Sequence, residues 1–331
     1  QRVHYISMGV FRNRAVLIFF RLYFSCLLPI SSALVPNLFE QTLSFRDART
    51  GVPVHIIGTM HYNPHSISKT AEIIRSYGEK GRLGSVGIES CDRRWNLVQV
   101  QQPPGSLFRQ LLDNEFQTAA EVGRQYIDND VVLFDEDIED NDKRVNEALL
   151  SSVRDYLNPL GGGWTAISND ILRGYAESVD PTSFGDGSTE ETAYLDRSAL
   201  FDPQMLLVAP VSLARYALAI FVRKPLKGIL LLVWIVTLIG LLFTRGFPGL
   251  TFAESALASA GGFALSLSVG LPLLGRVFLV ALLGERNEII GGNIRAECQR
   301  LVETGAEDAV CVAVLGLAHC NGVKRVLCEK T

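Results

Sequence analysis

The chain has 331 residues, a formal net charge of −4 and a hydrophobic content of 48%. This length allows one large domain or two ordinary ones with a sizeable core. The small negative charge comes without any concentrated basic stretch, which excludes a nucleic-acid-binding surface, so no nucleic-acid partner is expected. The apolar residues gather in a few stretches, and this predicts that part of the chain contacts lipid.

Residues 1–44 are predicted to be a targeting or anchor segment. The first 39 residues contain arginines and no acidic side chain, and an apolar stretch at 15–30 is followed by the small residues SSA. That pattern is typical of removable secretory or organellar targeting sequences, with an N-terminal membrane anchor as the alternative. We therefore expect the protein in the membrane of an organelle, a mitochondrion or plastid, with the endomembrane system as the alternative.

From residue 45 onward, strand and helix patterns alternate. Strands are predicted at 52–58 (VPVHIIG), 83–90 (LGSVGIES) and 131–137 (VVLFDED), and helices at 66–81 and 118–130. The alternation predicts an α/β fold with a mixed or parallel sheet flanked by helices. Residues 45–200 would form the first half of this domain, and their last part, 151–200, is rich in Gly, Asp, Ser and Thr, which predicts a surface loop or insertion.

Residues 201–283 are predicted to interrupt the domain as an apolar, membrane-associated hairpin. The segments 228–244 and 255–275 carry no charge, and they reach the roughly 17–25 residues that a bilayer-spanning helix needs. A pair of buried core helices is the alternative. The stretch 206–222 is broken by a proline and an arginine, which favours a packed or interfacial helix. Residues 284–331 would form the second half of the α/β domain.

Ionisable residues follow several predicted strands directly. His61 follows the strand that ends in Gly58, Glu89 follows SVGI, Asp135 follows VVLF, and His319 follows AVCVAVLGLA. In open α/β sheets, ligands bind beyond the carboxyl ends of the strands, so we expect these side chains to converge on one pocket. Imidazoles and carboxylates suit a first-row divalent metal ion.

Other histidines and the cysteines receive a structural interpretation. His55 falls within a predicted strand and His65 near the start of a helix, where both are expected to be structural. The six cysteines contain no C-x-x-C pair, which predicts reduced, mostly buried thiols. A Cys/His nucleophilic pair of Cys320 and His319 is an alternative, although adjacent side chains usually point apart.

Five motifs together resemble those of one protein family. IIGTMH, GIESCDRR, LFDEDIEDNDKR, GERNEIIGGNIRAEC and VAVLGLAHCNGV occur in an order and spacing similar to the TraB family, also called TraB/PrgY/GumN, which includes the Tiki proteins. The resemblance covers most of residues 50–150 and 284–328. It implies an α/β fold related to that of erythromycin esterases and a haem-binding lipoprotein group. Members of the Tiki type behave as divalent-metal-dependent proteases, whereas for many other members no reaction is settled.

The resemblance also implies roles for individual residues. The two G-x-x-H motifs end in His61 and His319, which would be the metal-binding or catalytic histidines. Glu89 would be the essential carboxylate and Arg94 its companion. Glu285 and Arg286 would line the same site. The chain departs from the family pattern at the end of the third predicted strand. The family commonly shows Gly-Asp-Arg there, whereas this chain has Phe134, Asp135 and Glu136.

The expected reaction is hydrolysis of a peptide or ester bond in a peptide or small-molecule substrate. A divalent ion (Mn, Co or Zn) held by His61, His319 and Glu89 would lower the pKa of bound water and polarise the scissile carbonyl. Arg94 or Arg286 would stabilise the oxyanion or hold Glu89 ionised. The alternative is a non-catalytic, membrane-anchored binding, regulatory or tethering protein. A third possibility is a protein that carries haem or a metal ion, which would use the same two histidines.

Overall fold

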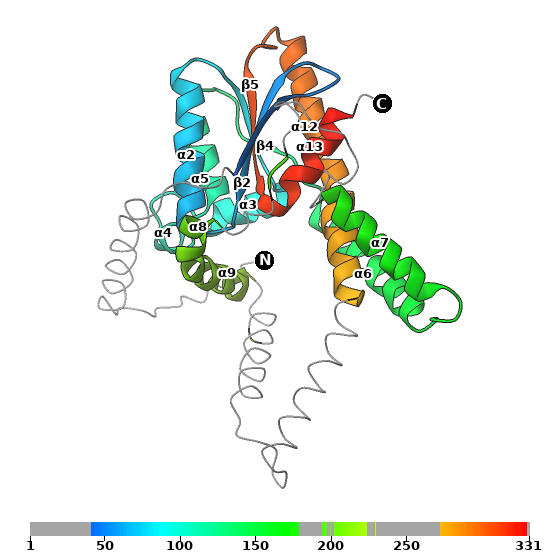
Figure 1. Ribbon diagram of the computed structural model, residues 1–331. Helices are drawn as coiled ribbons and strands as arrows, with labels where there is room; N and C mark the ends of the chain where they lie inside the picture. Colours follow the sequence, from blue (N-terminus) through cyan, green and yellow to red (C-terminus); the bar gives the residue numbers. More distant parts are fainter. Residues whose placement is uncertain are drawn as a thin grey trace, which may run out of the picture.

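The computed structural model describes residues 41–178, 194–196, 199, 202–223, 229 and 272–329. Its centre is a five-stranded sheet in the order β1-β2-β5-β3-β4 (Figure 1). β1 is antiparallel to β2, and the other neighbours are parallel, so the sheet is mixed. The strands are β1 (Thr42–Arg46), β2 (Pro53–Thr59), β3 (Leu83–Ile88), β4 (Val132–Leu133) and β5 (Val310–Gly316). β1 begins inside the segment 1–44 that was predicted to be a targeting or anchor segment.

β5 lies between two strands from the other end of the chain. Val314 faces Ile57 of β2 on one side and Ile88 of β3 on the other. Because these strands are parallel, their carboxyl ends meet at the same edge of the sheet. The residues that follow β2, β3 and β5 are thus placed next to one another.

One face of the sheet is covered by α2 (Pro64–Glu79) and α5 (Glu115–Gly123), with α3 (Asp92–Gln101) beside them. α2 starts where the Asn63 side chain accepts hydrogen bonds from two amides of the first turn, which satisfies donors that have no partner inside the helix. Its buried residues recur at helical spacing and pack against β3 and β5. The apolar cluster on this face includes Ile57, Ala71, Ile74, Val86, Ile88, Trp95, Ala119, Ala120, Val312 and Val314.

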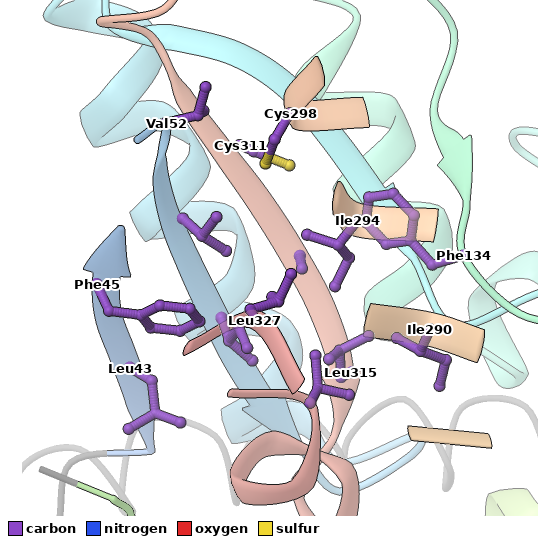
Figure 2. Close-up of a cluster of buried hydrophobic side chains, with 14 of the residues drawn as sticks. Leu43, Phe45, Val52, Phe134, Ile290, Ile294, Cys298, Cys311, Leu315 and Leu327 are labelled. Carbon is purple, nitrogen blue, oxygen red and sulfur yellow. The ribbon is translucent and has the colours of Figure 1, made fainter. Parts of the chain in front are cut away.

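The opposite face is covered by α12 (Glu285–Glu303) and α13 (Cys320–Cys328). Figure 2 shows side chains of α12 and α13 packed against those of the strands on this face. Every residue of β5 is buried, because alternate side chains enter the two apolar clusters. This explains why β5 is apolar throughout, as in strands that are covered on both faces.

Two helices occupy much of the region that was predicted to be a loop. These are α6 (Ile138–Tyr156) and α7 (Gly163–Ser178). Arg276 bridges them through ion pairs of 2.6 Å with Asp155 of α6 and Asp170 of α7. The prediction of a loop at 151–200 was therefore wrong as far as residue 178, because the high content of Gly and polar residues obscured the helical spacing. Residues 179–193 lie outside the described residues.

The predicted fold class was also wrong about a two-helix membrane hairpin. None of the helices in the described residues combines the length and the apolar character needed to cross a bilayer. Within 201–283 the structure describes α8 (Pro203–Leu207), α9 (Ala209–Arg223) and the π-helix η4 (Val277–Gly284), which runs directly into α12. The two apolar segments, 228–244 and 255–275, lie largely outside the described residues.

The remaining described elements are short. α4 (Leu107–Leu111) connects α3 to α5, and the 3-10 helix η5 (Leu317–His319) connects β5 to α13. α9 packs beneath the carboxyl edge of the sheet, where Ser212 donates a hydrogen bond to the His61 carbonyl and Arg215 donates one to the Tyr62 carbonyl. The prediction of a packed helix at 206–222 agrees with these contacts.

Two neighbouring glycines of α12 test how tightly this helix packs on α13. A Cβ at Gly291 would lie 2.6 Å from Val326 Cγ1, whereas one at Gly292 would meet nothing within 4 Å. We expect Gly291→Ala to lower the free energy of unfolding by about 1 kcal/mol, because overpacking outweighs the gain in helix propensity. Gly292→Ala should raise it by about 0.5–1 kcal/mol. Urea unfolding measures both values, and equal stabilisation by both substitutions would contradict the described packing.

Candidate functional site

Three of the predicted site residues meet at the carboxyl edge of the sheet. His61 follows β2, Glu89 follows β3, and His319 ends the short helix η5 after β5. His319 Nε2 lies 3.4 Å from Glu89 Oε1. A Cβ placed on Gly316 would lie 3.2 Å from Glu89 Oε2 and 3.6 Å from His61 Nε2. The three side chains therefore surround Gly316, where a Cβ would crowd the Glu89 carboxylate.

Each histidine is oriented by an acceptor at Nδ1. His61 Nδ1 lies 2.6 Å from Glu115 Oε1, and His319 Nδ1 lies 2.7 Å from Asn287 Oδ1. An acceptor at this position places the proton on Nδ1 and leaves the Nε2 lone pair for a ligand. His319 Nε2 faces Glu89, and His61 Nε2 lies beside Gly316. The pair thus has the tautomer that metal-binding histidines need.

Glu89 is buried as an ionised carboxylate. Its Oε2 accepts a hydrogen bond of 2.7 Å from the Gly316 amide, and its Oε1 accepts one of 2.6 Å from Arg286. Burial raises its pKa, but attraction to His319, Arg286 and His61, together with the Gly316 hydrogen bond, lowers the pKa to about 2. Glu89 therefore carries its negative charge at neutral pH.

The surroundings change the pKa values of the two histidines in opposite directions. Burial lowers the pKa of His61, but its hydrogen bond to Glu115 and the charges of Glu115 and Glu89 outweigh this and raise the pKa. The pKa of His319 is lowered because burial outweighs its attraction to Glu89. Near neutral pH, His319 is the neutral imidazole and His61 is the more basic one. Opposed shifts of this kind are typical of sites that divide chemical roles between similar groups.

The arginines do not pair as the resemblance implied. Arg94 forms its ion pair with Asp135 rather than with Glu89. Arg286 bridges the two carboxylates, at 2.6 Å from Glu89 and 2.5 Å from Asp135. Asp135 has a fully buried side chain, and two guanidinium groups compensate its charge. Asp135 therefore holds both arginines in place.

Glu285 lies apart from this cluster. Its side chain is 46% exposed and lies 3.8 Å from Arg144, which also pairs with Glu136. Neighbouring residues on a helix point about 100° apart, so Glu285 faces away when Arg286 faces Glu89. The structure thus places Arg286 in the site and Glu285 beside it.

A cavity of about 180 Å³ opens next to His61 and Glu89. Its polar end also includes Ser90, Arg94, Asn114 and Glu115, and its other walls are apolar and aromatic. The full lining consists of His61, Tyr62, Glu89, Ser90, Arg94, Trp95, Val98, Asn114, Glu115, Phe116 and Tyr216. The candidate site is therefore accessible from a small, partly apolar cavity.

The sequence did not reveal the two residues that orient the histidines. Glu115 follows the N-cap of α5, and an acidic residue in the first turn of a helix is common for reasons unrelated to a site. Asn287 stands in the quoted GERNEII motif, so its position was available although its role was not.

Tyr62 has a left-handed backbone conformation, with a φ of 61°. This conformation is uncommon for a residue with a side chain. Three contacts hold it: the Tyr62 amide donates to Glu115 Oε2 at 3.1 Å, and α9 binds the carbonyls of His61 and Tyr62. The turn after β2 is thereby fixed in the shape that holds the His61 ring against Glu115.

The structural interpretation of the other residues agrees with the structure. His55 Nδ1 is 2.7 Å from the Ser44 hydroxyl. Cys320 is fully buried in the apolar cluster beneath η5, and burial raises the pKa of its thiol. A nucleophilic pair with His319 is therefore excluded by the position of the thiol.

The donor chemistry of the cluster fits a divalent metal ion. Two imidazole Nε2 atoms and one ionised carboxylate are the donors that first-row divalent ions prefer. Within the described part of the chain, no group of three or more His, Cys, Asp or Glu side chains is arranged so that it could hold a metal ion. Since Arg286 and Gly316 bind Glu89, a metal ion would share this carboxylate with them.

Comparisons with protein-family models, with curated proteins and with solved structures find nothing that matches this chain. The resemblance to the TraB family therefore stays a prediction that depends on the sequence motifs. The reaction, the metal ion and the location in an organelle membrane are predictions of the same standing.

The Glu115 hydrogen bond predicts the tautomer of His61. In the metal-free protein at alkaline pH, nitrogen NMR should find the His61 proton on Nδ1, because Glu115 accepts it there. Glu115→Leu removes the acceptor, and we expect the Nε2-protonated form to become populated. Glu121→Leu, at an exposed position of the same helix, serves as the control. An unchanged tautomer in Glu115→Leu would contradict this role.

The lowered pKa of Glu89 predicts a loss of stability in acid. A carboxylate whose folded-state pKa lies below its unfolded value stabilises the fold above the unfolded pKa and loses this contribution as pH falls. For metal-free protein, the free energy of unfolding should therefore fall between about pH 4.5 and about pH 2. In Glu89→Gln the fall should be shallower. Denaturant unfolding across this range measures the difference, and parallel curves would count against it.

Proposed function

We propose that the protein is a hydrolase of peptide or ester bonds that works with a divalent metal ion at His61, His319 and Glu89. The observation that carries this proposal is the fixed orientation of the two imidazoles. Each Nδ1 is bonded to an acceptor from another element. His319 Nε2 then lies 3.4 Å from Glu89 Oε1, while His61 Nε2 and Glu89 Oε2 border the same position beside Gly316. Such outer partners are typical of metal-binding histidines.

The metal ion would be held by His61 Nε2, His319 Nε2 and a Glu89 oxygen, and when bound it would supply Lewis acidity and an activated water. The protein residues prepare this site. Glu115 and Asn287 fix the imidazole planes, while Arg286 and the Gly316 amide keep Glu89 ionised.

The pKa of Glu89 favours one of its two expected roles. A general base works best when its pKa lies near the working pH. With a pKa of about 2, Glu89 is a weak base at neutral pH but a permanently charged ligand. We therefore assign it to metal binding rather than to proton abstraction.

The two arginines differ in their access to substrate. Arg94 lines the cavity, and its side chain is 32% exposed. Arg286 is 11% exposed and is held between Glu89 and Asp135. Arg94 is thus the residue that can donate to the oxyanion formed during hydrolysis, and Arg286 keeps the carboxylates in place.

Metal binding and hydrolysis should depend on the same three side chains. We expect the full chain to bind about one Mn²⁺, Co²⁺ or Zn²⁺ ion and to cleave model peptides or esters only when loaded. His61→Ala and His319→Ala should each weaken metal binding at least tenfold, and Glu89→Gln should abolish hydrolysis. Calorimetry and elemental mass spectrometry measure binding. His65→Ala, a change four residues from His61 and outside the cavity lining, is the matched control.

Two results would overturn the proposal. Wild-type protein that binds none of these ions and cleaves no peptide or ester would exclude the hydrolase. Metal binding that survives unchanged in both histidine variants would show that these residues are not the ligands. Binding of a small ligand without turnover would instead favour the non-catalytic alternative.

A further inference from the structure

The walls of the cavity differ in character from its reactive end. Apart from the polar end, the lining is made by Tyr62, Trp95, Val98, Phe116 and Tyr216. They come from the turn after β2, from α3, from α5 and from α9. The wall is therefore assembled from four separate parts of the fold rather than from one apolar helix face.

Contacts between rings fix the shape of this wall. The Phe116 ring packs edge-on against the His61 ring, with centroids 5.4 Å apart, and Tyr62 packs in the same manner against Tyr216 at 6.0 Å. Trp95 is 7% exposed and belongs to the core of the sheet domain. An apolar surface thus begins directly beside the proposed metal-binding imidazole.

The charged groups at the polar end are already compensated by protein partners. Glu115 accepts hydrogen bonds from His61 and the Tyr62 amide, Glu89 accepts from Arg286, and Arg94 pairs with Asp135. A charged substrate side chain that entered the cavity would lose its water and would meet only charges that already have protein partners, which is costly. An uncharged, apolar group loses nothing comparable and gains contact with the rings.

The size of the cavity limits the group further. Pockets for drug-sized ligands measure roughly 300–1,000 Å³, whereas this one measures about 180 Å³. It therefore has room for one side chain rather than for an extended ligand.

We infer that the cavity is a specificity pocket for a single aromatic or large aliphatic side chain next to the bond that is cleaved. The adjacency to a scissile bond rests on the proposed hydrolase function, whereas the preference for an apolar group rests on the cavity alone. The substrate class is accordingly a peptide or an acyl-amino-acid ester with such a residue at the reacting carbonyl.

Val98 offers the variant that tests this pocket. It lies on α3 and lines the cavity, whereas Val100 on the same helix is 79% exposed and is not part of the lining. Val98→Trp should fill the pocket, and Val100→Trp adds the same side chain outside it. Both are made in the full chain.

Two measurements separate the pocket from the chemistry. The first is hydrolysis by metal-loaded protein of N-acetyl methyl esters of phenylalanine, alanine, aspartate and lysine. We expect kcat/KM to be at least tenfold higher for phenylalanine than for the other three. Val98→Trp should remove this preference, whereas Val100→Trp should keep it. The second is binding of N-acetyl-phenylalanine amide and N-acetyl-glycine amide to metal-free protein by ligand-detected NMR. Only the phenylalanine compound should bind, and only Val98→Trp should prevent it.

The outcomes distinguish the two proposals. Phenylalanine amide that binds in a Val98-dependent manner, without hydrolysis of any ester, supports the pocket and refutes the hydrolase. Ester hydrolysis without preference for phenylalanine supports the hydrolase and overturns the pocket. The pocket is also overturned if both amides bind equally, or if neither binds and no ester is cleaved.

Discussion

The position of β5 between β2 and β3 is the constraint on which the rest of the structure depends. This strand comes from the last part of the chain, is buried on both faces and pairs in parallel with both neighbours. The pairing brings the ends of three strands to one edge and places Gly316 beneath the side chains of His61 and Glu89. Without this strand, the two halves of the site would have no fixed relation to each other.

Burial of charge is the second condition that the fold satisfies. Glu89 and Asp135 have almost no exposed side-chain surface, and Arg286 contacts both of them. Removing one member of such a network leaves an uncompensated buried charge, which destabilises far more than the network stabilises. The site is consequently held together by electrostatic balance as well as by apolar packing.

The sequence predicted the convergence of His61, Glu89 and His319 because a general rule covers it. Residues just beyond parallel strands lie along one edge of the sheet, and the order β2-β5-β3 makes these three strands neighbours. The rule does not extend to the partners of those residues. Glu115 reaches His61 from α5, and Asp135 reaches Arg94 across the sheet edge, and such pairings depend on side-chain directions that appear only once the helices are packed.

The helical content was harder to predict where composition and packing conflict. α6 and α7 carry many polar residues and few buried ones, so apolar spacing gave little indication of a helix. The converse holds for 201–283, where apolar composition predicted a membrane hairpin. In the described part of that region, none of the helices is long and apolar enough to cross a bilayer. α9, which was predicted to be packed or interfacial, makes hydrogen bonds to the turn after β2.

One consequence of α9 concerns how the site can change shape. Ser212 and Tyr216 are four positions apart on this helix, so they lie on the same side of it. Ser212 binds the backbone of His61, while Tyr216 forms part of the cavity wall. The proposed metal ligand and part of the proposed pocket wall are therefore both attached to α9. In the proposed hydrolase, a displacement of α9 would alter selectivity and reactivity together.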